Sequence, residues 1–106
     1  MRKNPAMEGE DKSEPTWEAF SKAMRGRLST ADKASLPATA FAFPRTRKEP
    51  MTDVLHVRDA MARFNRVQGV TDPERDLAFA NIQKAARHFD IQMKETDWHQ
   101  FGSRGA

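Results

Sequence analysis

The residues of this sequence best suited to acid–base chemistry are an aspartate and a histidine three positions apart. Asp53 and His56 stand close to Arg58, and a carboxylate that orients an imidazole is common in general acid–base catalysis and in metal binding. No motif that supplies a nucleophile surrounds the pair. Asp53 is also a good N-cap for a helix that begins at the next residue. We favour the capping interpretation, and we expect no catalytic residue and no enzyme.

Other motifs that carry chemistry are missing from the sequence. The three histidines, His56, His88 and His99, are too widely spaced to form an HxxxH or HExxH pair, and there is no cysteine. The sequence contains no GxGxxG, no P-loop and no GxSxG. We therefore expect no metal site and no cofactor.

A set of basic side chains in the middle of the chain is the next candidate. Five of them could contact phosphate: Arg47, Lys48, Arg58, Arg63 and Arg66. However, Asp59 lies four residues before Arg63 on the same expected helix and is placed to pair with it, and Glu49 interrupts the run. We therefore favour an ordinary solvated helix face as the explanation of the charges, with a nucleic-acid-binding surface as the first alternative and an acidic protein partner as the second.

Four large apolar residues near the N-terminus recur at helical spacing. Trp17, Phe20, Met24 and Leu28 lie at i, i+3, i+7 and i+11, which predicts an amphipathic helix beginning at about Pro15. Its apolar stripe either folds back onto the chain's own core or docks on a partner or a second copy of the chain. These four are the candidate partner-binding residues.

Local signals predict where the other helices begin and end. Ser29 and Asp32 form a capping-box pattern for a short turn. Asp53 starts a helix that Gly69 ends, and Asp72-Pro73 starts another helix, which is expected to pack antiparallel to the first. The expected buried residues of the two helices are Val57, Ala60, Met61, Phe64 and Val67, and then Ala78, Ile82, Ala85 and Phe89.

The segment before these helices has a different character. Its sequence AFAFP, at residues 40–44, favours extended backbone because the residue before a proline avoids the helical region. Pro44 and Pro50 argue against a central strand, since proline has no N–H to donate. We expect an extended arm, or at most a short edge hairpin around residues 45–47.

The same part of the chain carries a recurring pattern. It runs LPxxAFAxP, RKxP and DxxHVRxAxARF between Leu36 and Phe64, and it resembles a family of small bacterial and phage-encoded proteins, a domain of unknown function. The resemblance covers about residues 36–92 and implies a domain without implying an activity. The chain departs from the pattern at Glu49, where the family has an aromatic residue, and at Asp90, where a glycine would close the last helix. The cap at Asp90 should be weaker by less than about 1 kcal/mol.

We predict a single, small all-α domain. A disordered charged arm (residues 1–14) precedes an amphipathic helix and a short capped turn (15–35), a compact helical domain (36–93) and a flexible tail (94–106).

Charge and hydropathy limit the function classes. The net charge is +3, and residues 36–94 carry ten basic and seven acidic side chains, which permits nucleic-acid binding without requiring it. No apolar run is long enough to cross a membrane, so we expect a cytoplasmic protein. The leading hypothesis is a non-enzymatic module that binds a protein partner or itself, and sequence-independent nucleic-acid binding is the alternative.

Overall fold

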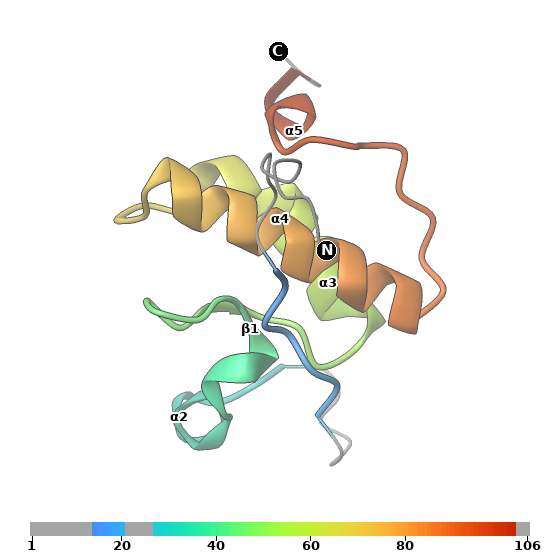
Figure 1. Cartoon of the computed structure of the whole chain (residues 1–106). Coiled ribbons are helices and arrows are strands. Elements are labelled where there is room, and N and C mark those ends of the chain that lie inside the picture. Colours follow the sequence, from blue (N-terminus) through green and yellow to red (C-terminus); the bar gives the residue numbers. More distant parts are fainter. Residues whose placement is uncertain (1–13, 21–26, 104–106) are drawn as a thin grey trace, which may run out of the picture.

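The computed structural model describes residues 14–20 and 27–103 (Figure 1). Its elements follow the chain in the order α2 (Thr30–Ser35), the 3₁₀ turn η1 (Ala38–Ala40), β1 (Phe41–Phe43), β2 (Lys48–Pro50), α3 (Val54–Arg63), the 3₁₀ turn η2 (Phe64–Arg66), α4 (Asp72–His88) and α5 (His99–Ser103). In Figure 1, α4 crosses the middle of the molecule, with β1 and α2 on one side of it and α5 on the other. The predicted disordered arm falls outside the described residues except for Glu14.

A two-stranded antiparallel sheet makes the fold a mixture of helix and strand, so the all-α prediction is wrong. Strands β1 and β2 pair with Phe41 opposite Pro50 and Phe43 opposite Lys48. Pro50 is tolerated because a two-stranded sheet has only edge strands, where a missing N–H need not break a ladder bond. The hairpin is also more central than expected, since all three residues of β1 are buried and β1 packs against α4.

The helix start signals are confirmed with one small shift. Ser29 and Asp32 form the predicted capping box of α2, and the Asp53 carboxylate accepts a hydrogen bond from the His56 N–H at 2.9 Å. For α4 the N-cap is Thr71, one residue earlier than predicted, and Glu74 completes its capping box. Each cap satisfies N–H groups that the first helical turn leaves without an intrahelical partner.

The helix ends differ more from the prediction. Helix α3 stops at Arg63 and continues as η2, whereas Gly69 lies beyond it with a φ of 79°. After α4, Asp90 takes a left-handed φ of 59°, at the place where the family pattern has glycine. The N–H of Ile91 donates to the Ala86 carbonyl at 2.7 Å, which closes this helix end.

The main core lies between the hairpin and the two longer helices. Helices α3 and α4 pack against each other, and the predicted residues Val57, Ala60, Ala78, Ile82 and Ala85 are all buried in this core. A second, smaller cluster of buried residues lies where β1 begins. It consists of Leu28, Leu36, Ala40 and Phe41, and the partly buried Phe20 packs against it.

The predicted N-terminal amphipathic helix is wrong over its first part, because residues 14–20 form no helix. This segment (blue in Figure 1) instead runs as an extended strap from the edge of α4 past β1. The N–H groups of Thr16 and Trp17 donate to the Asn81 side-chain oxygen at 2.7 and 2.8 Å, and the Glu18 N–H donates to the Thr39 carbonyl. The backbone is therefore held by distant residues and not by helical bonds to its neighbours.

The C-terminal segment also contributes to the core, although we expected a flexible tail there. The ring of Phe101 in α5 is buried, with its centroid 5.1 Å from that of Phe64 and 5.4 Å from that of Phe79. Trp98 donates a hydrogen bond from Nε1 to the Asp76 carboxylate at 2.8 Å. In Figure 1, α5 lies on the side of α4 opposite to β1, so the core has contacts from both sides of this helix.

Candidate nucleic-acid interface

A shallow cleft of about 570 Å³ lies between α2, the hairpin and the end of α3. Its charged lining residues are Lys33, Arg47, Lys48, Arg63 and Arg66, together with Glu49. We call this site the basic cleft. Four of the five cations predicted to contact phosphate line it, and Lys33 takes the place of Arg58, which lines neither this cleft nor the pocket beside it.

Arg47 is fixed in the basic cleft by contacts on two sides. One of its terminal nitrogens donates to the carbonyl oxygens of Lys33 at 2.9 Å and Leu36 at 2.7 Å. Its guanidinium carbon also lies 4.7 Å from the centre of the Phe41 ring. A guanidinium has five N–H donors, so an arginine held in this way keeps donors for an anion and loses little further freedom when one binds.

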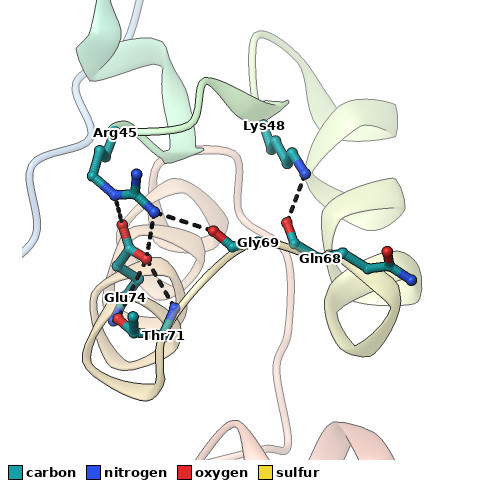
Figure 2. A network of polar contacts seen from close by, with 6 residues as sticks. All are labelled: Arg45, Lys48, Gln68, Gly69, Thr71 and Glu74. Atoms are coloured by element: carbon teal, nitrogen blue, oxygen red, sulfur yellow. Dashed lines mark hydrogen bonds and ion pairs between the residues drawn. The ribbon is translucent and has the colours of Figure 1, made fainter.

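The hairpin is tied to the α3–α4 connection by a second group of polar contacts (Figure 2). Arg45 forms an ion pair with Glu74 and donates to the Gly69 carbonyl at 3.1 Å. Lys48 donates from Nζ to the Gln68 carbonyl at 2.6 Å, so it bridges the two segments that border the cleft. Glu74 also accepts a hydrogen bond from the N–H of Thr71. The bonds from Arg45 and from Thr71 lower the pKa of the Glu74 carboxyl to about 2.

Three cations of the cleft have no such structural role. Within residues 14–20 and 27–103, the charged groups of Lys33, Arg63 and Arg66 make no hydrogen bond or ion pair, and all three residues are exposed. The predicted pairing of Asp59 with Arg63 is wrong for the described part of the chain, where the salt bridges involve other residues. The charge of Arg63 is thus available to a ligand.

Glu49 is the single acid of the basic cleft, and its backbone and its side chain are both unusual. Its φ is 59°, in the left-handed region that residues other than glycine rarely adopt, and Arg47 two residues earlier has a φ of 55°. Burial raises the pKa of the Glu49 carboxyl above its ordinary value, and the nearby charge of Arg63 opposes that shift. Strained backbone concentrates at functional sites more often than elsewhere.

A second pocket of about 400 Å³ shares a wall with the basic cleft, formed by Lys33, Glu49, Pro50 and Arg63. His56 and Leu55 border it from the first turn of α3. Leu55 is 64% exposed and is the only exposed large apolar residue among those the structure describes. The second pocket therefore offers apolar surface directly beside a site of strong positive charge.

The predicted pair of Asp53 and His56 is formed. The Oδ1 atom of Asp53 accepts a hydrogen bond from the backbone N–H of His56 at 2.9 Å. The imidazole Nδ1 of His56 lies 2.7 Å from the same oxygen. This carboxylate therefore caps α3 and orients the imidazole at once. His56 borders the second pocket, whereas Asp53 borders neither of the two cavities.

The four candidate partner-binding residues do not form one surface. Trp17 is 1% exposed in the main core, where its Nε1 donates to the Met51 carbonyl at 3.1 Å, and its ring lies edge-on to His88 and Phe89. Leu28 and the partly buried Phe20 belong to the second cluster, and Met24 lies outside the described residues.

Sequence reasoning missed one residue that lines the site and one that holds the fold together behind it. Lys33 reaches the basic cleft because Arg47 holds the carbonyl oxygens at the end of α2, a tertiary contact with no local sequence signal. Asn81 is fully buried and joins α4 to β1, since its side-chain nitrogen donates to the Ala42 carbonyl at 2.9 Å. A lone polar residue among the apolar positions of α4 was the only available sign of this role.

Comparisons with known proteins place the chain in a family. The model of a family of unknown function, DUF6582, matches residues 21–96, which include the whole recurring pattern between Leu36 and Phe64. No curated protein and no solved structure matches the chain. Among the described residues, no helix is long and apolar enough to cross a membrane. Because the family model matches well over half of the sequence, the chain belongs to the family of unknown function DUF6582.

Proposed function

We propose that this protein binds the phosphate groups of nucleic acid, without sequence preference. The observation that carries the proposal is the convergence of five cations and one carboxyl on the basic cleft. The cations come from α2, the hairpin and the end of α3, so they meet only in the folded chain. Clustered lysine and arginine attract the phosphate backbone by charge, and this attraction carries no base preference.

The arrangement of the cations supports this proposal beyond their number. Arg47 and Lys48 are held by carbonyl oxygens, and Arg63 and Arg66 extend without a partner in the described part of the chain. A solvated helix face would carry its charges in pairs along one helix. A cleft that mixes fixed and unpartnered cations from three segments is better suited to an extended polyanion.

A protein partner is the other predicted class of ligand, and the feature that motivated it has changed. That prediction relied on an exposed stripe along one helix, whereas Trp17 and Leu28 are buried in two different clusters. Binding of a protein partner remains a prediction, but the described residues of that stripe do not form an exposed surface. The nucleic-acid proposal has a defined site, and it agrees with a cytoplasmic location for a chain without cysteine.

We also propose that the site binds and does not catalyse. Asp53 borders neither cavity, and among the residues that the structure describes no serine, threonine or cysteine borders the second pocket beside His56. The Asp53 oxygen that contacts the imidazole also accepts the helix-capping N–H. An oriented histidine with no nucleophile beside it among the described residues is better explained as part of the wall of a binding site.

The test is salt-dependent binding to a labelled oligonucleotide, measured by fluorescence anisotropy on the full chain. In the variant Arg63→Gln/Arg66→Gln we expect weaker binding and a plot of log affinity against log salt that is shallower by about 2. The control Arg58→Gln/Arg87→Gln removes the same charge from exposed positions outside the cleft. Equal losses in the two variants, or no binding by the natural sequence at low salt, would refute the proposal.

A further inference from the structure

We infer that the second pocket receives an unstacked nucleobase, so that the ligand of the basic cleft is single-stranded nucleic acid. This inference rests on the proposed phosphate binding and names the class of nucleic acid. The two cavities share Lys33, Glu49, Pro50 and Arg63. A strand whose phosphates lie along the basic cleft would therefore bring its next base to the mouth of the second pocket.

The walls of the second pocket suit the flat, partly apolar face of a base. Leu55, Leu28 and Pro50 supply apolar surface, and the imidazole of His56 supplies a planar ring. The ring is held by the contact between its Nδ1 and Asp53. Proteins that bind single strands without sequence preference combine a positive groove with side chains on which bases stack. The exposure of Leu55 is explained if a base covers it.

The carboxyl groups of the pocket are placed to accept hydrogen bonds from the edge of a nucleobase. Glu49 and Asp59 border the pocket together with its apolar residues. The exocyclic amino groups of bases donate hydrogen bonds to such acceptors. Three cations, Arg27, Lys33 and Arg63, border the same pocket, so charge alone also admits an acidic peptide, and the experiment below therefore includes such a peptide as a probe.

A duplex is disfavoured for a different reason. Its bases are stacked and paired in the interior, so that placing one in the pocket requires unstacking at a cost of a few kcal/mol. A single strand has already lost that pairing and presents its bases at little cost. The adjacent pocket should therefore give the cleft a preference that phosphate contacts alone cannot give, because phosphates occur in both forms.

The experiment compares four probes at one low salt concentration and at equal concentrations of negative charge: a single strand of about ten nucleotides, an abasic strand of the same length, the corresponding duplex, and an oligoglutamate peptide with one leucine. We expect the ordinary strand to bind between about 5-fold and about 150-fold more tightly than the abasic strand, the range for stacking of one base. In Leu55→Ser that ratio should fall toward 1. The control Arg58→Ser changes an exposed residue of the same helix that borders neither cavity, and it should keep the ratio.

The outcomes separate the two proposals. If the ordinary and abasic strands bind equally and Leu55→Ser alters neither, the base pocket is refuted while phosphate binding stands. Tighter binding of the duplex, or of the peptide, also refutes it. If none of the nucleic acids binds at low salt, the proposed function fails and this inference fails with it.

Discussion

The hairpin contributes to two faces of this molecule that treat polar groups in opposite ways. On the face covered by residues 14–20, Asn81 and the backbone of Thr16, Trp17 and Ala42 satisfy one another in a buried network. In the basic cleft, cations remain exposed, and two residues hold left-handed backbone without being glycine. The first arrangement stabilises a fold, whereas the second lowers its stability and keeps charge available. The contrast indicates that stability and binding can be changed separately.

The largest expected effect is on the covered face. Trp17→Ala should lower the free energy of unfolding by about 3–5 kcal/mol, because it leaves a large cavity in the main core. That is a large share of the total stability of a small domain. Urea denaturation followed by circular dichroism measures the loss.

The milder variant Trp17→Phe keeps most of the apolar volume and loses the bond from Nε1 to the Met51 carbonyl. It should remain folded and bind nucleic acid as the natural sequence does. If its affinity falls together with its stability, the two faces are coupled and the separation proposed here is wrong.

The next effect concerns the polar network beneath the strap. Asn81→Ala leaves the N–H groups of Thr16 and Trp17 and the Ala42 carbonyl without their partner, which should cost about 2–4 kcal/mol. Amide hydrogen exchange at Thr16 and Trp17 should accelerate more than exchange within α4. Uniform acceleration throughout the chain would mean that Asn81 supports the whole core and does not specifically hold the strap.

The covered face also explains what sequence reasoning could and could not predict. The caps at Ser29 and Asp53 were predicted because each depends on a residue three positions away. The strap depends on Asn81, which lies 65 positions from Thr16. The helical spacing of Trp17 and Leu28 was therefore coincidental, since the two residues serve different clusters. Tertiary partners override local periodicity in such segments.

The candidate site, like the fold, could be predicted in part from the sequence. Charge is visible in a sequence, so Arg47, Lys48, Arg63 and Arg66 could be proposed, and the structure gathers them in one cleft. The addition of Lys33 depends on how α2 docks against the hairpin. The prolines allowed at most a short edge hairpin around residues 45–47, and the structure has a hairpin there. The burial of β1 against α4 could not be predicted, because it depends on tertiary packing.

A smaller effect is expected from pH in the basic cleft. Burial raises the pKa of Glu49 from 4.5, so as the pH falls from neutral this carboxyl is protonated before an ordinary glutamate and the cleft loses its only negative charge. Phosphate binding should then strengthen by about 5-fold, which corresponds to about 1 kcal/mol for one charge pair in water. In Glu49→Gln the gain should be present at every pH.

The same shift makes a prediction for stability. A carboxyl whose folded pKa is raised contributes stability that is complete below its unfolded pKa and is lost as the pH rises through the folded pKa. Glu49→Gln should thus be more stable than the natural sequence near neutral pH and lose that advantage below about pH 4. A pH dependence of the same size in Glu49→Gln would contradict the assignment of the effect to Glu49.

The smallest expected effect separates two positions with the same backbone conformation. Asp90 and Glu49 both have a φ of 59°, and glycine should relieve strain at either one. We expect Asp90→Gly to stabilise the fold by less than about 1 kcal/mol and to leave binding unchanged, because Asp90 follows α4 and borders neither cavity. Glu49→Gly should also relieve strain, but it removes the acid of the cleft and frees the backbone beneath it. Thermal unfolding and oligonucleotide binding, measured on both variants, test whether the strained backbone at Glu49 contributes to binding. If the two glycine variants have the same effect on binding, the left-handed residue in the cleft is no more functional than Asp90 at the end of α4.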